Sequence, residues 1–383
     1  QYSFPLQQHG QCLLNQGFIL CIHGCRRFVQ NHYRCILQDC PGNGDALPFA
    51  SGKSTTVFAD VAMITIWQAG DELITSSSSG SLQYFFVRGS RPAKADVLHH
   101  RIIKERHILK DDGVIPEEFV YTSPGYLPQV NGVTPPGGVF AHIAGEDLVQ
   151  GEDGRWWVLE DNLRIPSGAS YPLFVRDIER RADPKLFRDV SLRDNRDYPR
   201  LLRKTMDFVS TEGIAVVLSP GRFNSAFFEH AYLAEKTGAE LVFPEDLEVL
   251  DNKVYLRDYS GCHHRVGVVY RRLSDEYLDP FAFNPDSVIG VPGILGAYRA
   301  GNVAIVNALG NGVADDKAVY YFVPRMVEYY LNEKPILQNA PTYMPLFEKD
   351  RKEVLSRLGE LVIKDVAEAG GYGVVFGSSL DKM

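Results

Sequence analysis

The sequence predicts a mixed α/β (α+β) fold, because segments with strand character alternate with helical segments over most of its length. The clearest unit covers 214–243, where a buried strand, a helix over 224–236 and a second strand follow one another. Such a unit implies two parallel strands with the helix packed over them. A second observation is a turn at 152–154 followed by an apolar strand over 155–161. We expect this strand to form an antiparallel hairpin with 140–143.

Further elements follow along the chain. Strands are expected over 253–257, 266–273 and 303–307, and 314–331 has the apolar spacing of a long amphipathic helix. A last helix over 347–358 leads into a strand over 361–364. These segments add further strands and helices to the first unit.

Composition limits the classes of protein that fit. The 383 residues are 45% apolar and 23% charged, as in an ordinary globular protein of two or three domains. The net charge of −8 is spread along the chain, which argues against a nucleic-acid partner. We find neither a run of eighteen apolar residues nor a basic start followed by an apolar run. We therefore expect no membrane partner and a cytoplasmic location; the oligomeric state is not indicated.

The first 88 residues differ from the rest. Only ten charged side chains fall in the first 90 residues, and apolar residues there follow no sustained period. Our hypothesis is that 1–88 is not native to the fold and derives from a shifted reading frame or a broken gene end; the alternative is a genuine accessory domain. Five of the six cysteines lie there, at spacings that favour neither zinc nor a disulfide framework: Cys12, Cys21, Cys25, Cys35 and Cys40.

Oxygen-bearing side chains lie at the end of the 155–161 strand. Glu160 and Asn162 fall on one face, because strand side chains alternate with a period of two. Asp147, on the other side of the hairpin, is a candidate third ligand. Such oxygens suit Mg²⁺. Taken alone, the pattern is more typical of an ordinary turn after a strand.

A lysine and a glycine-rich loop occur about two hundred residues later. Lys364 ends an apolar strand, and Gly370, Gly371 and Gly373 surround Tyr372. Glycines let backbone N–H groups approach phosphate closely, while a lysine supplies a point charge. Without other information a hairpin turn is the more common explanation. Glu368 is either a further metal ligand or a solvated surface charge.

Several longer motifs resemble one family. They are Gly132-Val-Thr-Pro-Pro-Gly-Gly-Val139, Trp156-Trp-Val-Leu-Glu160-Asp-Asn162, Arg164-Ile-Pro-Ser-Gly168, Leu218-Ser-Pro-Gly221, Phe228-Glu229-His230, Arg271-Arg272, Gly312-Val-Ala-Asp-Asp-Lys317 and Val362-Ile-Lys364. Together they resemble the circularly permuted ATP-grasp family, related to glutathionylspermidine synthetase and glutathione synthetase, over about residues 94 to 383. The strand with the candidate metal ligands Glu160 and Asn162 precedes the lysine and the glycine loop in the sequence, as in that permuted branch.

The resemblance implies an ATP-grasp fold and ATP-dependent joining of a small-molecule or peptide carboxylate to an amine through an acyl phosphate. It implies ATP and Mg²⁺ as cofactors and carries over the roles of particular residues. The metal ligands would be Asp147, Glu160, Asn162 and Glu368; the ATP-binding residues Lys364, Gly370, Gly371, Tyr372 and Gly373; the catalytic residues Arg164 and Lys364. Weaker candidates for substrate contacts are Asn224, His230 and Arg272.

The resemblance also suggests a division of the chain. After the 1–88 segment we expect an ATP-grasp portion with the metal hairpin over 89–211, an inserted βαβ substrate domain over 212–310, and the lysine and glycine-loop subdomain over 311–383. ATP-grasp ligases have further strands after the glycine loop, and about ten residues remain here. We therefore expect a C-terminally truncated fragment. The alternatives to a ligase are a non-catalytic ATP-grasp-like binding or scaffold protein and an inactive fragment.

Overall fold

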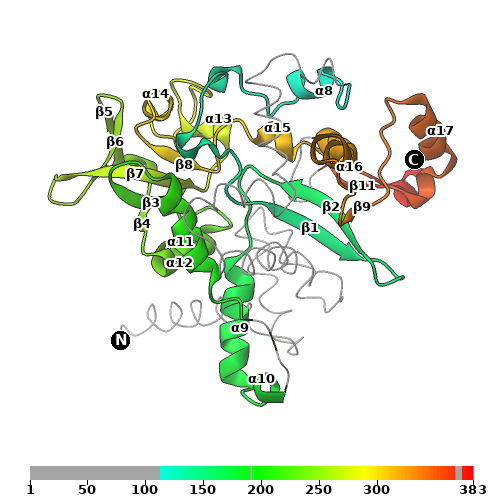
Figure 1. Cartoon of the computed structure of the whole chain (residues 1–383), viewed down its shortest axis with the longest axis horizontal. Helices are drawn as coiled ribbons and strands as arrows, with labels where there is room; N and C mark the ends of the chain where they lie inside the picture. The colour runs from blue at the N-terminus through cyan, green and yellow to red at the C-terminus, as the bar shows by residue number, and fades with distance from the viewer. Residues whose placement is uncertain (1–112, 190–191, 193, 367–372, 383) are drawn as a thin grey trace, which may run out of the picture.

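The computed structural model describes residues 113–189, 192, 194–366 and 373–382. The expected 1–88 segment, with its five cysteines, therefore lies outside the described residues. Most of the glycine loop at 370–373 also lies outside them. Figure 1 shows a large sheet on the left, a long hairpin in the centre and a small helical unit on the right. The α/β prediction is confirmed in this general form, as several mixed sheets with helices packed on them.

The large sheet has six strands. Its core is β3 between β4 and β7, with β8 on the other side of β7, all parallel to one another. An antiparallel extension through β6 and β5 completes it. The strands are β3 (Ile214–Leu218), β4 (Glu240–Val242), β5 (Leu247–Leu250), β6 (Lys253–Arg257), β7 (His263–Arg271) and β8 (Ala304–Val306). The predicted strand–helix–strand unit is thus confirmed.

Both faces of this sheet are covered. On β3, Val216 and Leu218 enter one apolar cluster with residues of α14, while Ala215 and Val217 enter another with residues of α11 and α12. This division follows from the alternation of strand side chains, and burial on both faces explains why the strand is apolar throughout. The helices are α8 (Glu118–Tyr121), α9 (Ser170–Ala182), α10 (Leu186–Asp189), α11 (Tyr198–Val209), α12 (Phe227–Thr237), α13 (Asp275–Leu278), α14 (Ile294–Arg299), α15 (Gly312–Asp315), α16 (Lys317–Leu331) and α17 (Glu348–Ser356).

Two smaller sheets complete the fold. β1 (Gly145–Gln150) and β2 (Trp156–Asn162) form the central antiparallel hairpin, and β9 (Gln338–Asn339) adds a short parallel edge. β10 (Val362–Ile363) pairs with β11 (Val375–Phe376). Helix α16 packs on the hairpin, where the Tyr320 hydroxyl donates to the Val158 carbonyl at 2.6 Å. Short 3₁₀ helices lie at η3 (Pro128–Val130), η4 (Pro136–Gly138), η5 (Pro244–Asp246), η6 (Leu358–Glu360) and η7 (Gly377–Lys382).

The hairpin partner predicted for 155–161 is wrong. β2 pairs with 145–150, and 140–143 is a loop whose backbone is bound by side chains. The Asn307 amide oxygen accepts hydrogen bonds from the His142 and Ile143 N–H groups, and the Asn311 amide donates to the Phe140 carbonyl. The backbone groups of Phe140, His142 and Ile143 therefore form hydrogen bonds with side chains instead of with a neighbouring strand.

Two helix starts also differ from the prediction. The helix expected over 224–236 begins at Phe227, because the Asn224 side chain accepts from the Ala226 N–H in a preceding turn rather than capping the helix. The helix expected over 314–331 is two helices, divided at Asp316. Asp316 has extended backbone angles and caps α16 by accepting from the Ala318 N–H at 2.8 Å.

No helix in the described part of the chain is long and apolar enough to cross a membrane.

Candidate functional site

The hairpin brings three of the predicted metal ligands together. Asp147 on β1 lies directly opposite Glu160 on β2. The Asn162 amide nitrogen lies 3.4 Å from the Asp147 carboxylate. The register shifts immediately after Asp147, so a bulge lies beside it. Because the true partner of β2 is the strand that contains Asp147, the three side chains are closer in the fold than the expected hairpin implied.

Lys364 joins this group from the other end of the chain. Burial raises the pKa of Asp147 to about 6, and repulsion from Glu160 adds to the effect. The positive charges of Lys364 and Lys317 act on the same carboxylate in the opposite direction. The charge of Lys364 therefore acts on the hairpin that carries Asp147, although the two motifs lie about two hundred residues apart in sequence.

The oxygen donors at this cluster fit a hard divalent cation. Asp147 and Glu160 provide carboxylates, and Asn162 provides an amide oxygen. The pKa of Asp147 is raised mainly by its burial and further by the charge of Glu160, so a cation bound between the two carboxylates would favour their ionised forms. Among the described residues no group of three or more His, Cys, Asp or Glu side chains is arranged to hold a metal. A site here therefore relies on the amide of Asn162 for its third protein oxygen.

The predicted glycine loop is only partly described. Glu368, Gly370, Gly371 and Tyr372 lie outside the described residues, so their predicted roles stay predictions. Gly373 follows in a turn with φ of 67°, in the left-handed region that favours glycine.

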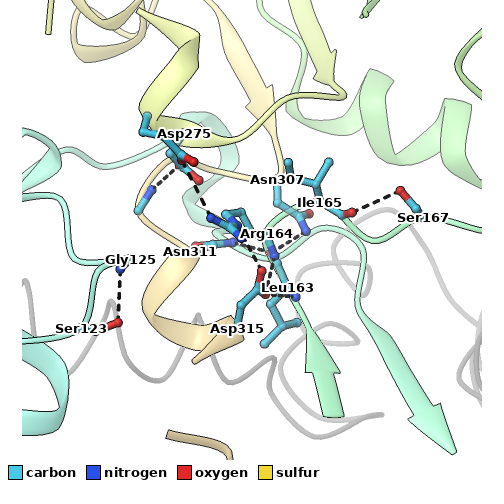
Figure 2. Close-up of polar contacts among 12 residues, drawn as sticks. Ser123, Gly125, Leu163, Arg164, Ile165, Ser167, Asp275, Asn307, Asn311 and Asp315 are labelled. Carbon is cyan, nitrogen blue, oxygen red and sulfur yellow. Dashed lines mark hydrogen bonds and ion pairs between the residues drawn. The ribbon is translucent and has the colours of Figure 1, made fainter. Parts of the chain in front are cut away.

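Arg164 lies just beyond β2 and is held by acidic side chains. Its Nε is 3.2 Å from an Asp315 carboxylate oxygen, and Glu276 approaches its other side at 3.9 Å. Burial lowers the pKa of Arg164, but the carboxylates of Asp315, Asp275 and Glu276 outweigh it and raise that pKa. Figure 2 shows Arg164 and Asp315 side by side, with Asn307 and Asn311 next to them. The guanidinium therefore stays charged and fixed in direction.

Asn307 and Asn311 tie the end of β2 to the large sheet. The Asn307 amide donates to the carbonyls of Ile143 and Leu163 at 2.7 and 2.8 Å, and Asn311 also donates to the Leu163 carbonyl (Figure 2). Asn307 follows β8 and is 2% exposed. The sequence predicted a strand ending here but gave no signal for these side-chain bonds.

Arg272 and Glu229 form a buried ion pair that contacts the loop after β2. An Arg272 guanidinium nitrogen is 2.9 Å from the Glu229 carboxylate, and both side chains are 1% exposed. The same carboxylate accepts from the Gly168 and Ser170 N–H groups, and Arg272 donates to the Pro166 carbonyl. This pair binds the loop after β2 to α12 and β7. The weaker prediction that Arg272 contacts a substrate stays a prediction.

The other weak candidates lie on or before α12. His230 is 1% exposed, and its Nδ1 lies 2.9 Å from the Ser219 hydroxyl at the end of β3. Burial lowers the pKa of His230 to about 3, so the ring is neutral near pH 7. Asn224 is exposed in the turn before the helix.

The family model described as a circularly permuted ATP-grasp matches residues 90–383. The chain belongs to the circularly permuted ATP-grasp family. The resemblance seen in the motifs is confirmed, and membership implies a nucleotide-binding fold. The match starts close to the residue at which the sequence becomes regularly patterned.

Known relatives of this ATP-grasp chain cover the same region. An uncharacterized protein of Synechocystis is 47% identical over 278 residues, which are 72% of this chain and 57% of the relative. An uncharacterized protein of Mycobacterium tuberculosis is 47% identical over 280 residues, 72% of this chain and 50% of the relative. A Frankia casuarinae protein named "Putative glutamate--cysteine ligase 2-2" is 41% identical over 283 residues, 73% of this chain and 32% of the relative. The chain spans about half the length of the first two relatives.

Proposed function

We propose that the protein to which this chain belongs is an ATP-dependent ligase that joins an amino-acid or peptide carboxylate to an amine through an acyl phosphate. The observation that carries the proposal is the placement of Asp147 opposite Glu160 and beside Asn162 on one hairpin, with the positive charge of Lys364 acting on Asp147. Membership of the ATP-grasp family and the ligase name of the Frankia relative support the same chemistry.

The proposed reaction has two steps. A carboxylate oxygen of the substrate attacks the γ-phosphorus of ATP, the bond to the bridging oxygen breaks, and ADP leaves. The amine nitrogen then attacks the acyl carbon, phosphate leaves, and the amine loses a proton as the C–N bond forms. Such phosphoryl transfer depends mainly on positioning and on neutralisation of charge.

The residues of the cluster supply these two requirements. In the proposal Lys364 holds phosphate oxygens, and Arg164, fixed by Asp315, faces the negative charge of the acyl phosphate. Asp147, Glu160 and Asn162, with Glu368 as a further ligand, would hold Mg²⁺. Magnesium, when bound, neutralises phosphate charge during the transfer. The segment with Gly370, Gly371, Tyr372 and Gly373 would cover the phosphates and exclude water.

The test measures ADP release by the complete protein that contains this chain, with magnesium–ATP and a panel of amino acids and amines. We expect release only when a carboxylate and an amine are both present, and a loss of about 100-fold or more in Lys364→Ala. Lys352→Ala, which removes an exposed lysine of α17 paired with Glu348, is the matched control and should retain full activity.

Three outcomes contradict this proposal. Equal turnover in Lys364→Ala removes Lys364 from the mechanism. Tight binding of magnesium–ATP without ADP release across the panel favours a non-catalytic binding protein. Failure of the complete protein to bind magnesium–ATP excludes ATP-dependent chemistry, whereas failure of the isolated chain alone favours an inactive fragment.

A further inference from the structure

Residues 340–366, which carry Lys364, form a unit without a buried core of its own. The unit contains α17, the 3₁₀ helix η6 and β10. All of its residues are described, and none of them is buried. Figure 1 shows α17 at the right-hand edge of the molecule, on the far side of α16 from the large sheet. The place of Lys364 therefore depends on how this unit is attached to the rest of the protein.

Both ends of the unit are attached to the first turns of α16. At its end, the Val366 carbonyl accepts from the Lys317 N–H at 3.0 Å. At its start, the side-chain amide of Asn339 donates to the Tyr320 carbonyl at 2.9 Å. The two attachment points on α16 are three residues apart, so Lys364 lies on a loop that is closed at one turn of a helix.

The bond from Asn339 is made where residue 324 of the helix supplies no donor. In an α-helix the Tyr320 carbonyl would accept from the N–H of the residue four positions later. That residue is Pro324, inside α16, and proline has no backbone N–H. Pro324 thus makes the Tyr320 carbonyl available to a side chain from β9.

The strand β9 also contacts the hairpin. Val158 of β2 is the register partner of Asn339. The Val158 carbonyl accepts from the Ala340 N–H at 2.7 Å and from the Tyr320 hydroxyl at 2.6 Å. Asn339 therefore lies where the hairpin, α16 and the unit with Lys364 meet.

Stability alone does not explain an asparagine at this position. The Asn339 amide nitrogen makes its hydrogen bond, but the amide oxygen is buried and accepts from no donor in the part of the chain that the structure describes. A buried acceptor without a donor costs at least as much free energy as one hydrogen bond contributes. An apolar side chain of the same size would avoid this cost, so the asparagine is better explained by the contact that it holds in place.

We propose that Asn339 is a positioning residue for Lys364. Through its bond to the Tyr320 carbonyl, which Pro324 makes available, Asn339 fixes the point at which the 340–366 unit leaves α16, and with it the place of Lys364 beside the hairpin. This inference rests on the proposed function, in which Lys364 holds phosphate oxygens of ATP. Asn339 itself contacts neither the metal nor the nucleotide in this role.

Calorimetry on the complete protein that contains this chain tests the inference with two probes, Mg²⁺ alone and magnesium–ATP. Asn339→Leu keeps the size of the side chain and removes its donor. It should weaken magnesium–ATP binding about fivefold, which corresponds to one net hydrogen bond. Binding of Mg²⁺ alone should not change, because the candidate ligands Asp147 and Glu160 lie on the hairpin. Asn339→Ala provides the same comparison if Asn339→Leu does not fold.

Gln338→Leu is the matched control on the same strand. The Gln338 side-chain amide donates to the Pro335 carbonyl at 3.2 Å, three positions earlier in the chain. Its removal should leave both affinities unchanged. A loss of magnesium–ATP affinity as large as that of Asn339→Leu would mean that any change in β9 has this effect, and would overturn the specific role of Asn339.

A second substitution separates positioning from stability. Pro324→Ala restores an N–H to residue 324, which can then donate to the Tyr320 carbonyl within the helix. Added to Asn339→Leu, it should raise the urea midpoint of unfolding, while magnesium–ATP binding stays about fivefold weaker than in the wild type. Recovery of the affinity together with the stability would mean that Asn339 serves only the fold.

The effect should also depend on Lys364. In a Lys364→Gln background, Asn339→Leu should weaken magnesium–ATP binding further by less than about twofold, because the two substitutions affect the same contact with phosphate. A further loss as large as that in the wild-type background would mean that Asn339 does not act through Lys364.

Failure of this inference differs from failure of the proposed function. A complete wild-type protein that binds no magnesium–ATP overturns both. Equal affinity for magnesium–ATP in the wild type and in Asn339→Leu overturns only the role of Asn339. Weaker binding of Mg²⁺ alone in Asn339→Leu means that Asn339 supports the hairpin rather than the unit that carries Lys364.

Discussion

The carboxylate of Asp315 holds Arg164 at two points and the neighbouring Leu163 at a third. Its Oδ2 lies 3.2 Å from the Arg164 Nε, and its Oδ1 accepts from the Arg164 N–H at 2.8 Å and from the neighbouring N–H of Leu163. One side chain from α15 therefore fixes both the backbone at the end of β2 and the direction of the guanidinium (Figure 2). Asn162 lies only two residues before Arg164, so the same contact also steadies the candidate metal strand.

Asp315→Ala should destabilise the protein by about 2 to 3 kcal/mol, because it removes the charge and leaves two backbone N–H groups without their acceptor. Asp315→Asn should cost about 1 kcal/mol, since its amide oxygen can still accept from the backbone. Urea unfolding of the two variants measures the difference. Equal losses in the two variants would mean that the backbone bonds contribute nothing.

Removal of the Arg272 side chain should destabilise the protein more than removal of the Asp315 side chain. Arg272→Met leaves the Glu229 carboxylate buried without its cation, which costs about 3 to 5 kcal/mol. The double variant Arg272→Met with Glu229→Gln should be more stable than Arg272→Met alone, because no unpaired charge remains. Denaturant unfolding of the single and double variants tests this order.

Arg200→Met provides the control for the buried pair. Arg200 pairs with Asp197 at 2.9 Å on the surface, with 50% and 59% of the two side chains exposed. Its removal should change the free energy of unfolding by less than about 1 kcal/mol, since exposed ion pairs contribute little. A loss as large as that of Arg272→Met would show that burial does not explain the difference.

His142 should make stability depend on pH. Burial lowers the pKa of His142 to about 4, and nearby Arg271 adds to the effect. Below the ordinary value of 6.5 the unfolded chain therefore binds a proton that the folded chain excludes, so stability falls as pH falls from 6.5 towards 4. The loss from this residue is about 1.4 kcal/mol per pH unit in that window.

Comparison of His142→Gln with the wild type isolates this contribution. The difference in free energy of unfolding between them should stay constant from pH 7 to pH 8 and shift in favour of the variant by about 2 kcal/mol at pH 5. Urea unfolding at the three pH values provides the measurement. A difference that does not change with pH would mean that His142 titrates normally in the fold.

The parts of the fold that follow from local pattern were predicted well. The run of buried apolar residues at β3, the strand β6 and the strand that carries Glu160 are all strong local signals. The partner of β2 was predicted wrongly because an apolar run at 140–143 looks like a strand. Its backbone is bound instead by Asn307 and Asn311, which lie more than 160 residues away in sequence.

In the candidate site, too, local pattern was predictable and contacts between residues far apart in sequence were not. Glu160 and Asn162 were predicted from their places on a strand, and family resemblance added Lys364. The pairing of Lys317 with Glu160 depends on the break between α15 and α16, which has no proline or glycine at Asp316 to mark it. The pair of Arg272 with Glu229 joins residues 43 positions apart. No periodic pattern reports a contact of that kind.

Asn307 has a consequence for motion in this protein. Its amide accepts two hydrogen bonds and donates two, so every bond that this side chain offers is already used between β8, the 140–143 loop and the residue after β2. One side chain therefore joins the large sheet to the chain on both sides of the hairpin, and a movement of the hairpin relative to the sheet would have to break these four hydrogen bonds.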